Sequence, residues 1–208
     1  MFKHHLLSVV NQGLLALDVA QSKGKVPKNN LSESHFFSVW VGQAIKSKQF
    51  DISVLAILKA WQQQARTQGA GANLRQIFSH LQSTYSPLAD SAALSNEQFE
   101  AMLKMLGELG WQLTCDITIK KKLAITSNGN SSLVMAEDDR DNVFLTKNKV
   151  SCYVRGQQQQ FIDVCYALGI LVFKVTDYKS AVKFHGEFIL QINNNYNQLA
   201  QIPTEHLS

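Results

Sequence analysis

The sequence predicts an α+β fold, with helices in the N-terminal half and a β-sheet in the C-terminal half. Up to Gly110 the apolar residues recur every three or four positions, which is the period of amphipathic helices. From Trp111 to Ile119 every second residue is apolar, which is typical of a half-buried strand. The alternating residues are Leu113, Cys115, Ile117 and Ile119. We therefore expect a five-helix region (residues 1–110) packed on a mixed sheet with one crossover helix (residues 111–208).

The join between these two parts is too short for a flexible linker, because Gly110 looks like a helix C-cap that leads directly into a strand. We expect one compact unit, with a helical subdomain and a strand-rich subdomain that meet at Trp111.

Composition excludes several classes of protein. With 45% hydrophobic and 17% charged residues among 208, the chain has enough apolar surface for a core and is not disordered. The sequence contains no run of about 18 apolar residues, so it predicts no membrane span. The three cysteines are odd in number and widely spaced, which argues against disulfides and structural zinc. We expect a cytoplasmic protein without a metal or cofactor.

The charge is modestly basic and evenly divided about Gly110. The net charge is +4, with ten Lys/Arg against seven Asp/Glu in residues 1–110 and ten against nine in residues 111–208. This balance permits nucleic-acid binding without predicting it.

Five helices account for the first part. The first ends at Gly24, the second is expected to start at an N-cap Ser32, and the third is capped by Asp51. Asn73 with Gln76, and Ser95 with Gln98, have capping-box spacing at the fourth and fifth helices.

Two nucleotide or nucleic-acid interpretations of this part have less support than ordinary structural ones. The segment 69–73 (Gly-Ala-Gly-Ala-Asn) has no preceding strand and no Lys-Ser/Thr pair, so it predicts a turn rather than a phosphate loop. A winged helix-turn-helix would need base-contacting side chains, but the fifth helix offers Lys104 among Glu97, Glu100 and Glu108.

The strand-rich part begins with a strand over residues 112–119. The turn signal at 127–130 predicts a hairpin between residues 122–127 and 132–136. The acidic run 137–141 lacks the spacing of a calcium loop and indicates a solvated loop. Strand, helix and strand then follow within residues 150–173, which predicts a βαβ crossover.

The final strand, residues 182–192, supplies most of the candidate site residues. Alternation places Lys183, His185 and Glu187 in a row on the face opposite Phe184 and Phe188. Such a row could transfer protons or bind a metal with help from another segment. It is also what the solvent-exposed face of an ordinary antiparallel strand shows, and we favour that interpretation.

Two enzyme signatures add further candidates. His185-Gly186-Glu187 matches the H-x-E of zinc deaminases, but their P-C-x-x-C is missing, which excludes that class. Asp177 and Lys179 have the D-x-K spacing of metal-dependent nucleases, and Asp116 could supply the upstream carboxylate. Nothing in the sequence requires these two segments to meet.

Three segments together resemble a family of uncharacterised bacterial proteins of about this length. They are Ser32-Glu33-Ser34-His35-Phe36, Gly69-Ala70-Gly71-Ala72-Asn73-Leu74 and Phe184-His185-Gly186-Glu187-Phe188. The resemblance covers nearly the whole chain and implies a small cytoplasmic bacterial protein. The family is a domain of unknown function, so the resemblance supplies no catalytic residues.

Two functional hypotheses follow. The first is a non-enzymatic binding or regulatory module that engages a protein or, with less support, nucleic acid; clustered exposed basic or aromatic side chains would favour it. The second is a metal-dependent hydrolase or nuclease, which requires Asp116, Asp177, Lys179, His185 and Glu187 to converge in a cleft.

Overall fold

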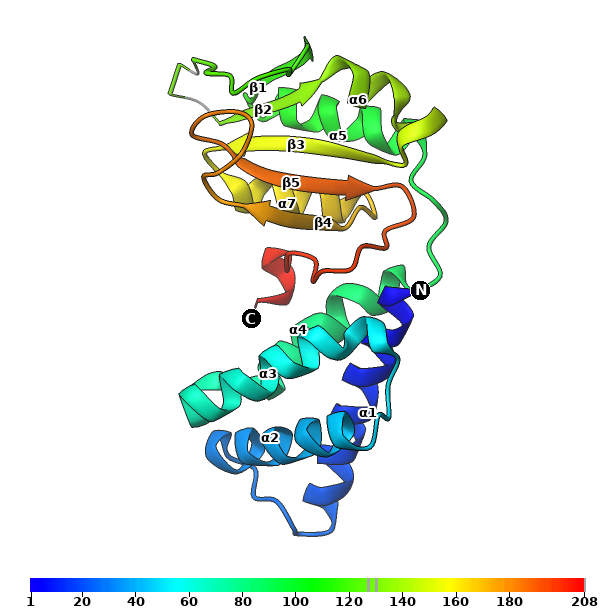
Figure 1. The fold of residues 1–208 in the computed structure, drawn as a ribbon, viewed down its shortest axis with the longest axis vertical. Helices are drawn as coiled ribbons and strands as arrows, with labels where there is room; N and C mark the ends of the chain where they lie inside the picture. The colour runs from blue at the N-terminus through cyan, green and yellow to red at the C-terminus, as the bar shows by residue number, and fades with distance from the viewer. Residues whose placement is uncertain (127, 130, 208) are drawn as a thin grey trace. The chain divides into compact units, whose positions relative to one another are not determined.

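The protein divides into two compact units, Met1–Ala89 and Asp90–Ser208, here called the helical unit and the sheet unit. The computed structural model describes residues 1–126, 128–129 and 131–207 (Figure 1). Helices make up the first unit and a mixed sheet lies in the second, so the fold is α+β, as predicted. Within those described ranges, no helix is both long and apolar enough to cross a membrane.

The division falls about twenty residues before the change of period at Gly110. The reason is the fifth helix, α5 (Asn96–Glu108), whose apolar side chains pack with the strands of the sheet unit. Trp111 likewise belongs to the sheet unit, where its ring is buried and its Nε1 donates to Gln160 Oε1 at 2.7 Å. That the two units form one compact body stays a prediction.

Four α-helices form the helical unit. They are α1 (Phe2–Ser22), α2 (Asn30–Lys46), α3 (Leu55–Gln68) and α4 (Leu74–Tyr85), with short 3-10 turns η1 (Ile52–Val54), η2 (Gly69–Ala72) and η3 (Ser86–Leu88). Phe78 of α4 is at the centre of the core, with its ring centroid 4.7 Å from those of both Phe37 and Trp61. The helices can approach this ring closely because α1 has glycine at position 13.

The helix starts agree with the sequence in two cases and differ in two. Asp51 accepts a hydrogen bond from Ser53 N at 2.9 Å and thereby caps η1, the 3-10 turn that leads directly into α3, and the Ser95–Gln98 capping box is complete. The cap of α2, however, is Asn29, which accepts from Ser32 N, so the N-cap prediction at Ser32 was wrong. Asn73 has a left-handed backbone and makes no side-chain cap, so the predicted capping box there was also wrong.

The sheet unit contains five strands within the described residues. They are β1 (Gln112–Ile117), β2 (Ser132–Ala136), β3 (Lys149–Arg155), β4 (Val172–Thr176) and β5 (Gly186–Gln191), in the spatial order β1-β2-β3-β5-β4. The pair β1 and β2 is parallel, and the other neighbours are antiparallel, so the sheet is mixed. β3 and β4 both run antiparallel to β5 and hence parallel to each other, joined by the crossover helix α7 (Gln158–Ala167).

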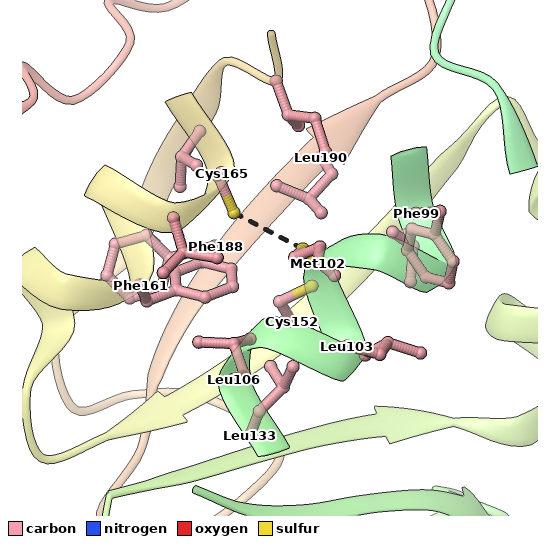
Figure 2. Close-up of a cluster of buried hydrophobic side chains, with 14 of the residues drawn as sticks. Phe99, Met102, Leu103, Leu106, Leu133, Cys152, Phe161, Cys165, Phe188 and Leu190 are labelled. Atoms are coloured by element: carbon pink, nitrogen blue, oxygen red, sulfur yellow. Dashed lines mark hydrogen bonds between the residues drawn. The ribbon is translucent and has the colours of Figure 1, made fainter. Parts of the chain in front are cut away.

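The main core of the sheet unit lies between the sheet and the helices α5 and α7, which cover one of its faces (Figure 1). In this core the Cys165 thiol donates to Met102 Sδ at 3.4 Å, beside Cys152 (Figure 2). Burial raises the pKa of both buried thiols well above its usual range. Cys152 and Cys165 are free thiols that serve as core residues, as the sequence indicated.

The predicted hairpin between residues 122–127 and 132–136 was wrong. β2 pairs instead with β1 and β3, and Leu123 forms an isolated parallel bridge with Val182. Ser127 and Asn130 of the predicted turn lie outside the described residues. The acidic run is not a loop but a short helix, α6 (Glu137–Asn142), followed by a π-helical turn, η4 (Val143–Lys147).

Irregular strand geometry causes two further differences from the predicted strands, one in β1 and one before β5. On β1 the step from Thr114 to Ile117 spans one residue more than its counterpart on β2, so Leu113 and Ile117 point to opposite faces. The predicted strand 182–192 is shorter, because Phe184 has a φ of 65° and breaks the extended backbone before Gly186. Phe184 is therefore exposed, although the sequence pattern placed it with the core residues.

Candidate functional site

Asp116 lies on the exposed side of β1, the strand at one edge of the sheet. It lines an open cavity of about 620 Å³ together with Glu100 and Arg140, which face each other at 3.8 Å. Half-buried Cys115 lies in the same cavity, and burial raises the pKa of its thiol. None of the other five predicted site residues lines this cavity.

Asp177 and Lys179 lie in the turn that follows β4, at the opposite edge of the sheet. The Asp177 carboxylate pairs with Lys174, and the backbone N–H of Lys179 donates to Thr176 Oγ1 at 3.2 Å. β1 and β4 are four strand spacings apart, or about 19 Å. The sheet order therefore keeps Asp116 away from Asp177 and Lys179.

His185 is fully buried, whereas the row with Lys183 and Glu187 would make it solvent-exposed. It does lie on the sheet face away from α5 and α7, but chain segments cover that face here. Lys183 N donates to Leu123 O at 2.7 Å, which joins the segment before β2 to the chain two residues before His185. Lys183 stays exposed and Glu187 is half-buried opposite Tyr153, whose pKa is raised by burial and then by the Glu187 carboxylate.

The imidazole of His185 makes two hydrogen bonds. Its Nδ1 lies 2.8 Å from Lys183 O, and its Nε2 lies 2.9 Å from Ser132 Oγ. Because a carbonyl can only accept, Nδ1 carries the proton and Nε2 accepts from the serine hydroxyl. Burial lowers the pKa of His185, so the neutral form is favoured.

A serine bound to an oriented imidazole is the arrangement of an activated nucleophile. Here both side chains are buried, Ser132 at 1% exposure, and neither lines a cavity among those described. In this structure the pair is a buried hydrogen bond within the sheet unit.

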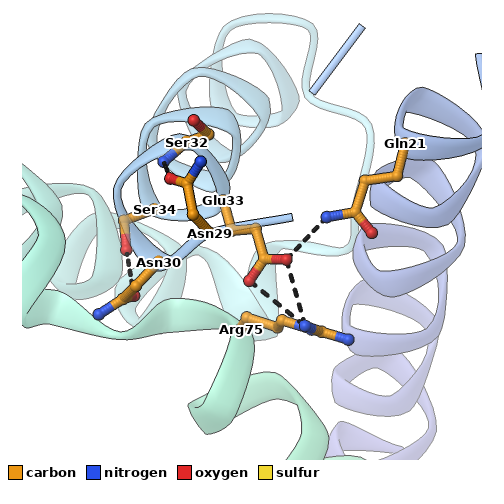
Figure 3. Close-up of polar contacts among 7 residues, drawn as sticks. All are labelled: Gln21, Asn29, Asn30, Ser32, Glu33, Ser34 and Arg75. Carbon is orange, nitrogen blue, oxygen red and sulfur yellow. Dashed lines mark hydrogen bonds and ion pairs between the residues drawn. The ribbon is translucent and has the colours of Figure 1, made fainter. Parts of the chain in front are cut away.

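The helical unit holds a second buried polar network, centred on Glu33 in the first turn of α2. Arg75 of α4 reaches both carboxylate oxygens at 3.2 and 3.4 Å, and Gln21 of α1 donates to Oε1 at 2.7 Å (Figure 3). The next residue, Ser34, contacts Ala70 O at 3.4 Å. This network links α1, α2, η2 and α4 and fixes the N-terminal half of α2.

Beside this network runs an open, mostly apolar groove of about 560 Å³, here called the α2 groove. It is lined by Lys25, Val26, Pro27, Leu31, Ser32, His35, Phe36 and Val39. Leu31 and Val39 are 68% and 45% exposed, although aliphatic side chains of this size are usually buried. Leu31, His35 and Val39 are spaced by four residues, so they form one stripe along the helix.

The unit around this groove is strongly basic. Residues 1–89 contain nine Lys/Arg and three Asp/Glu, a net charge of +6, whereas residues 90–208 contain eleven and thirteen, a net charge of −2. Two of the three acids are already engaged, since Glu33 binds Arg75 and Asp51 lies 3.1 Å from His5. Lys23, Lys25 and Lys28, on the segment between α1 and α2, are all exposed.

The sequence patterns directed attention to the sheet, and they missed this surface. The signal was present in the charge distribution, but a boundary at Gly110 assigned Asp90, Glu97, Glu100 and Glu108 to the helical part and halved its net charge from +6 to +3. Among residues 1–126, 128–129 and 131–207, no three His, Cys, Asp or Glu side chains lie together in a way that could hold a metal ion.

Comparison with known proteins gives one match. The model of a family described as "Protein of unknown function (DUF2913)" matches residues 1–203. No curated protein and no solved structure matches the chain. Two of the segments that carried the resemblance, 32–36 and 69–74, meet in the helical unit through the Ser34–Ala70 contact.

Proposed function

We propose that this chain, which belongs to the DUF2913 family of proteins of unknown function, is a non-enzymatic binding module. Its helical unit binds an acidic segment of a partner protein. The observation that carries this proposal is the combination of an apolar groove and a net charge of +6 in the same unit.

The shape and chemistry of the α2 groove favour a helical peptide. The aliphatic stripe of Leu31 and Val39 matches the apolar face of an amphipathic helix, which binds grooves through residues at i, i+3, i+4 and i+7. Lys25 in the wall, with Lys23 and Lys28 beside it in sequence, favours acidic residues on the remaining faces.

A protein fits this surface better than a nucleic acid does. Single-stranded nucleic acids are held by exposed aromatic rings on which bases stack. The aromatic residue of the groove, Phe36, is half-buried, and the exposed apolar residues are aliphatic. A cytoplasmic location is part of the proposal, since the three cysteines are free thiols.

The test is a titration of the full chain with three probes at low and high salt. They are a synthetic helical peptide with leucine at i, i+3, i+4 and i+7 and glutamate elsewhere, the same peptide with lysine for glutamate, and a duplex oligonucleotide. We expect that, of the three probes, only the acidic peptide binds saturably. Preferential, strongly salt-dependent binding of the oligonucleotide would replace the protein partner with nucleic acid.

A matched pair of variants locates the site. Leu31→Glu places a negative charge in the groove and should weaken binding of the acidic peptide about tenfold or more, since a buried leucine contributes about 1.5–3 kcal/mol. Leu15→Glu makes the same change on α1, at a leucine that is 63% exposed and outside the groove, and should leave the affinity unchanged. Equal effects of both variants would contradict the proposed groove.

A further inference from the structure

A second cavity of the helical unit, here called the α2–α3 pocket, lies where α2 ends and α3 begins. Its volume is about 400 Å³, within the range of small-molecule sites. The apolar wall consists of Ala44, Ile45, Phe50, Ile52, Leu55 and Leu58. It shares no lining residue with the α2 groove, so an inference about it does not depend on the proposed function.

The polar groups of this pocket are two lysines and one aspartate. The aspartate, Asp51, is already engaged: its carboxylate accepts from Ser53 N and lies beside His5. The hydrogen bonds from Ser53 lower the pKa of Asp51, which keeps it ionised in these contacts. Lys48 and Lys59 have no comparable hydrogen bond among the described residues and remain as the cations of the pocket.

Lys48 has an unusual backbone for a lysine. It follows the C-cap of α2 with a φ of 52°, and its N–H donates to Ile45 O at 3.2 Å. Glycine is the usual residue at this left-handed position, because a Cβ is strained there. A lysine with this strained backbone in the wall of an apolar pocket suggests a role for its side chain.

We propose that the α2–α3 pocket binds a straight-chain carboxylate, such as a fatty acid of medium length. The alkyl chain lies against the apolar wall, and the carboxylate lies at Lys48 and Lys59. An apolar cavity with cations at its polar positions matches this ligand and disfavours alkyl amines, which would bring like charges together.

The experiment is a calorimetric titration of the full chain with octanoate, decanoate and dodecanoate below their micelle concentrations. The alcohol and the amine of each length serve as comparators. We expect the affinity for carboxylates to rise about fourfold per methylene until the pocket is filled. The alcohols should bind about tenfold more weakly, since hydrogen bonds to charged groups are the stronger kind. Equal affinities for carboxylate, alcohol and amine, or the lack of saturable binding, would overturn the proposal.

Variants separate binding from folding. Lys48→Gly removes the cation but suits the left-handed backbone, so the melting temperature should hold or rise while carboxylate affinity falls about tenfold. Lys46→Gln removes an exposed charge of α2 outside the pocket and should change neither the melting temperature nor the affinity for carboxylates. If Lys48→Gly binds carboxylates as the natural chain does, the assigned role of Lys48 is wrong.

Mapping by methyl NMR identifies the cavity. Decanoate should shift the signals of Ile45, Ile52 and Leu55 and leave those of Leu31 and Val39 in place. It should also leave the acidic peptide bound at the α2 groove. Shifts confined to Leu31 and Val39 would assign the ligand to the α2 groove and contradict the second site.

Discussion

The helical unit and the sheet unit differ in their charge balance and in the surroundings of their potential binding or reactive groups. In the helical unit, lysines outnumber acids, and exposed aliphatic side chains line a groove and a pocket. In the sheet unit the charges nearly balance, and the reactive groups His185, Ser132, Cys152 and Cys165 are enclosed. An unbalanced charge beside exposed apolar surface is what a partner can complement, whereas enclosed and mutually satisfied groups contribute to stability.

The largest difference should come from the core of the sheet unit. Phe161→Ala removes a fully buried ring between Trp111 and Phe188 and should lower the free energy of unfolding by about 3–5 kcal/mol. Phe184→Ala removes a ring that is 72% exposed and should change it by less than about 0.5 kcal/mol. Urea titrations followed by fluorescence measure both; similar losses would show that Phe184 has a covered position in solution.

Two helix glycines provide a comparison between the units. A Cβ added at Gly13 of α1 would lie 2.6 Å from a buried Phe78 carbon, so Gly13→Ala should cost about 1–3 kcal/mol of stability. A Cβ added at Gly107 of α5 would lie 3.8 Å from Leu113, an ordinary contact. Gly107→Ala should therefore stabilise the sheet unit by about 0.5–1 kcal/mol. We expect the two substitutions to change the thermal unfolding temperature in opposite directions. A gain in stability from Gly13→Ala would contradict the close packing of α1 on Phe78.

The Glu33 network should respond asymmetrically to the loss of each partner. Arg75→Ala leaves a buried carboxylate with Gln21 as its remaining side-chain donor and should cost about 2 kcal/mol. Glu33→Gln leaves an arginine that is half exposed and can be solvated, so about 1 kcal/mol is expected. Urea titrations measure the two unfolding free energies and show which variant loses more stability. A larger loss for Glu33→Gln would show that the Arg75 guanidinium cannot be solvated freely.

A pH-dependent difference is expected from His185. Because burial lowers its folded-state pKa, the unfolded chain binds the proton more readily in the interval below the ordinary histidine pKa. The sheet unit should therefore lose stability as the pH falls below about 6.5, with a slope of at most about 1.4 kcal/mol per pH unit for one proton. In His185→Gln this slope should be smaller between pH 7 and pH 5. An unchanged slope would assign the acid sensitivity to other groups.

Local sequence signals predicted the elements well where one interaction decides them. The Ser95–Gln98 box and the Asp51 cap involve residues three or two apart, so their geometry follows from the sequence. The crossover helix α7 and its flanking strands were predicted on the same basis. At α2 the sequence offers both Asn29 and Ser32, which suit the role of N-cap, and the structure uses Asn29.

Long-range pairing accounts for the two wrong predictions in the strand-rich part that concern the hairpin and His185. Residues 122–126 looked like half of a hairpin, but Leu123 pairs with Val182, some sixty residues later in the chain. The same pairing lies next to His185 in the chain, and His185 is fully buried although alternation alone had placed it on a solvent-exposed face. Period-two patterns fix which residues share a face, but what covers that face depends on segments far away in the sequence.

The sequence by itself determined the α+β class, the order of most helices and strands, and membership of a family of unknown function. These depend on hydrophobic period and on capping, which are local properties. Only the tertiary structure decided that α5 belongs with the sheet, and hence that the charge is concentrated on Met1–Ala89. The change at Gly110 marks where the backbone switches from helix to strand, whereas the unit boundary at Ala89 reflects which apolar faces bury one another.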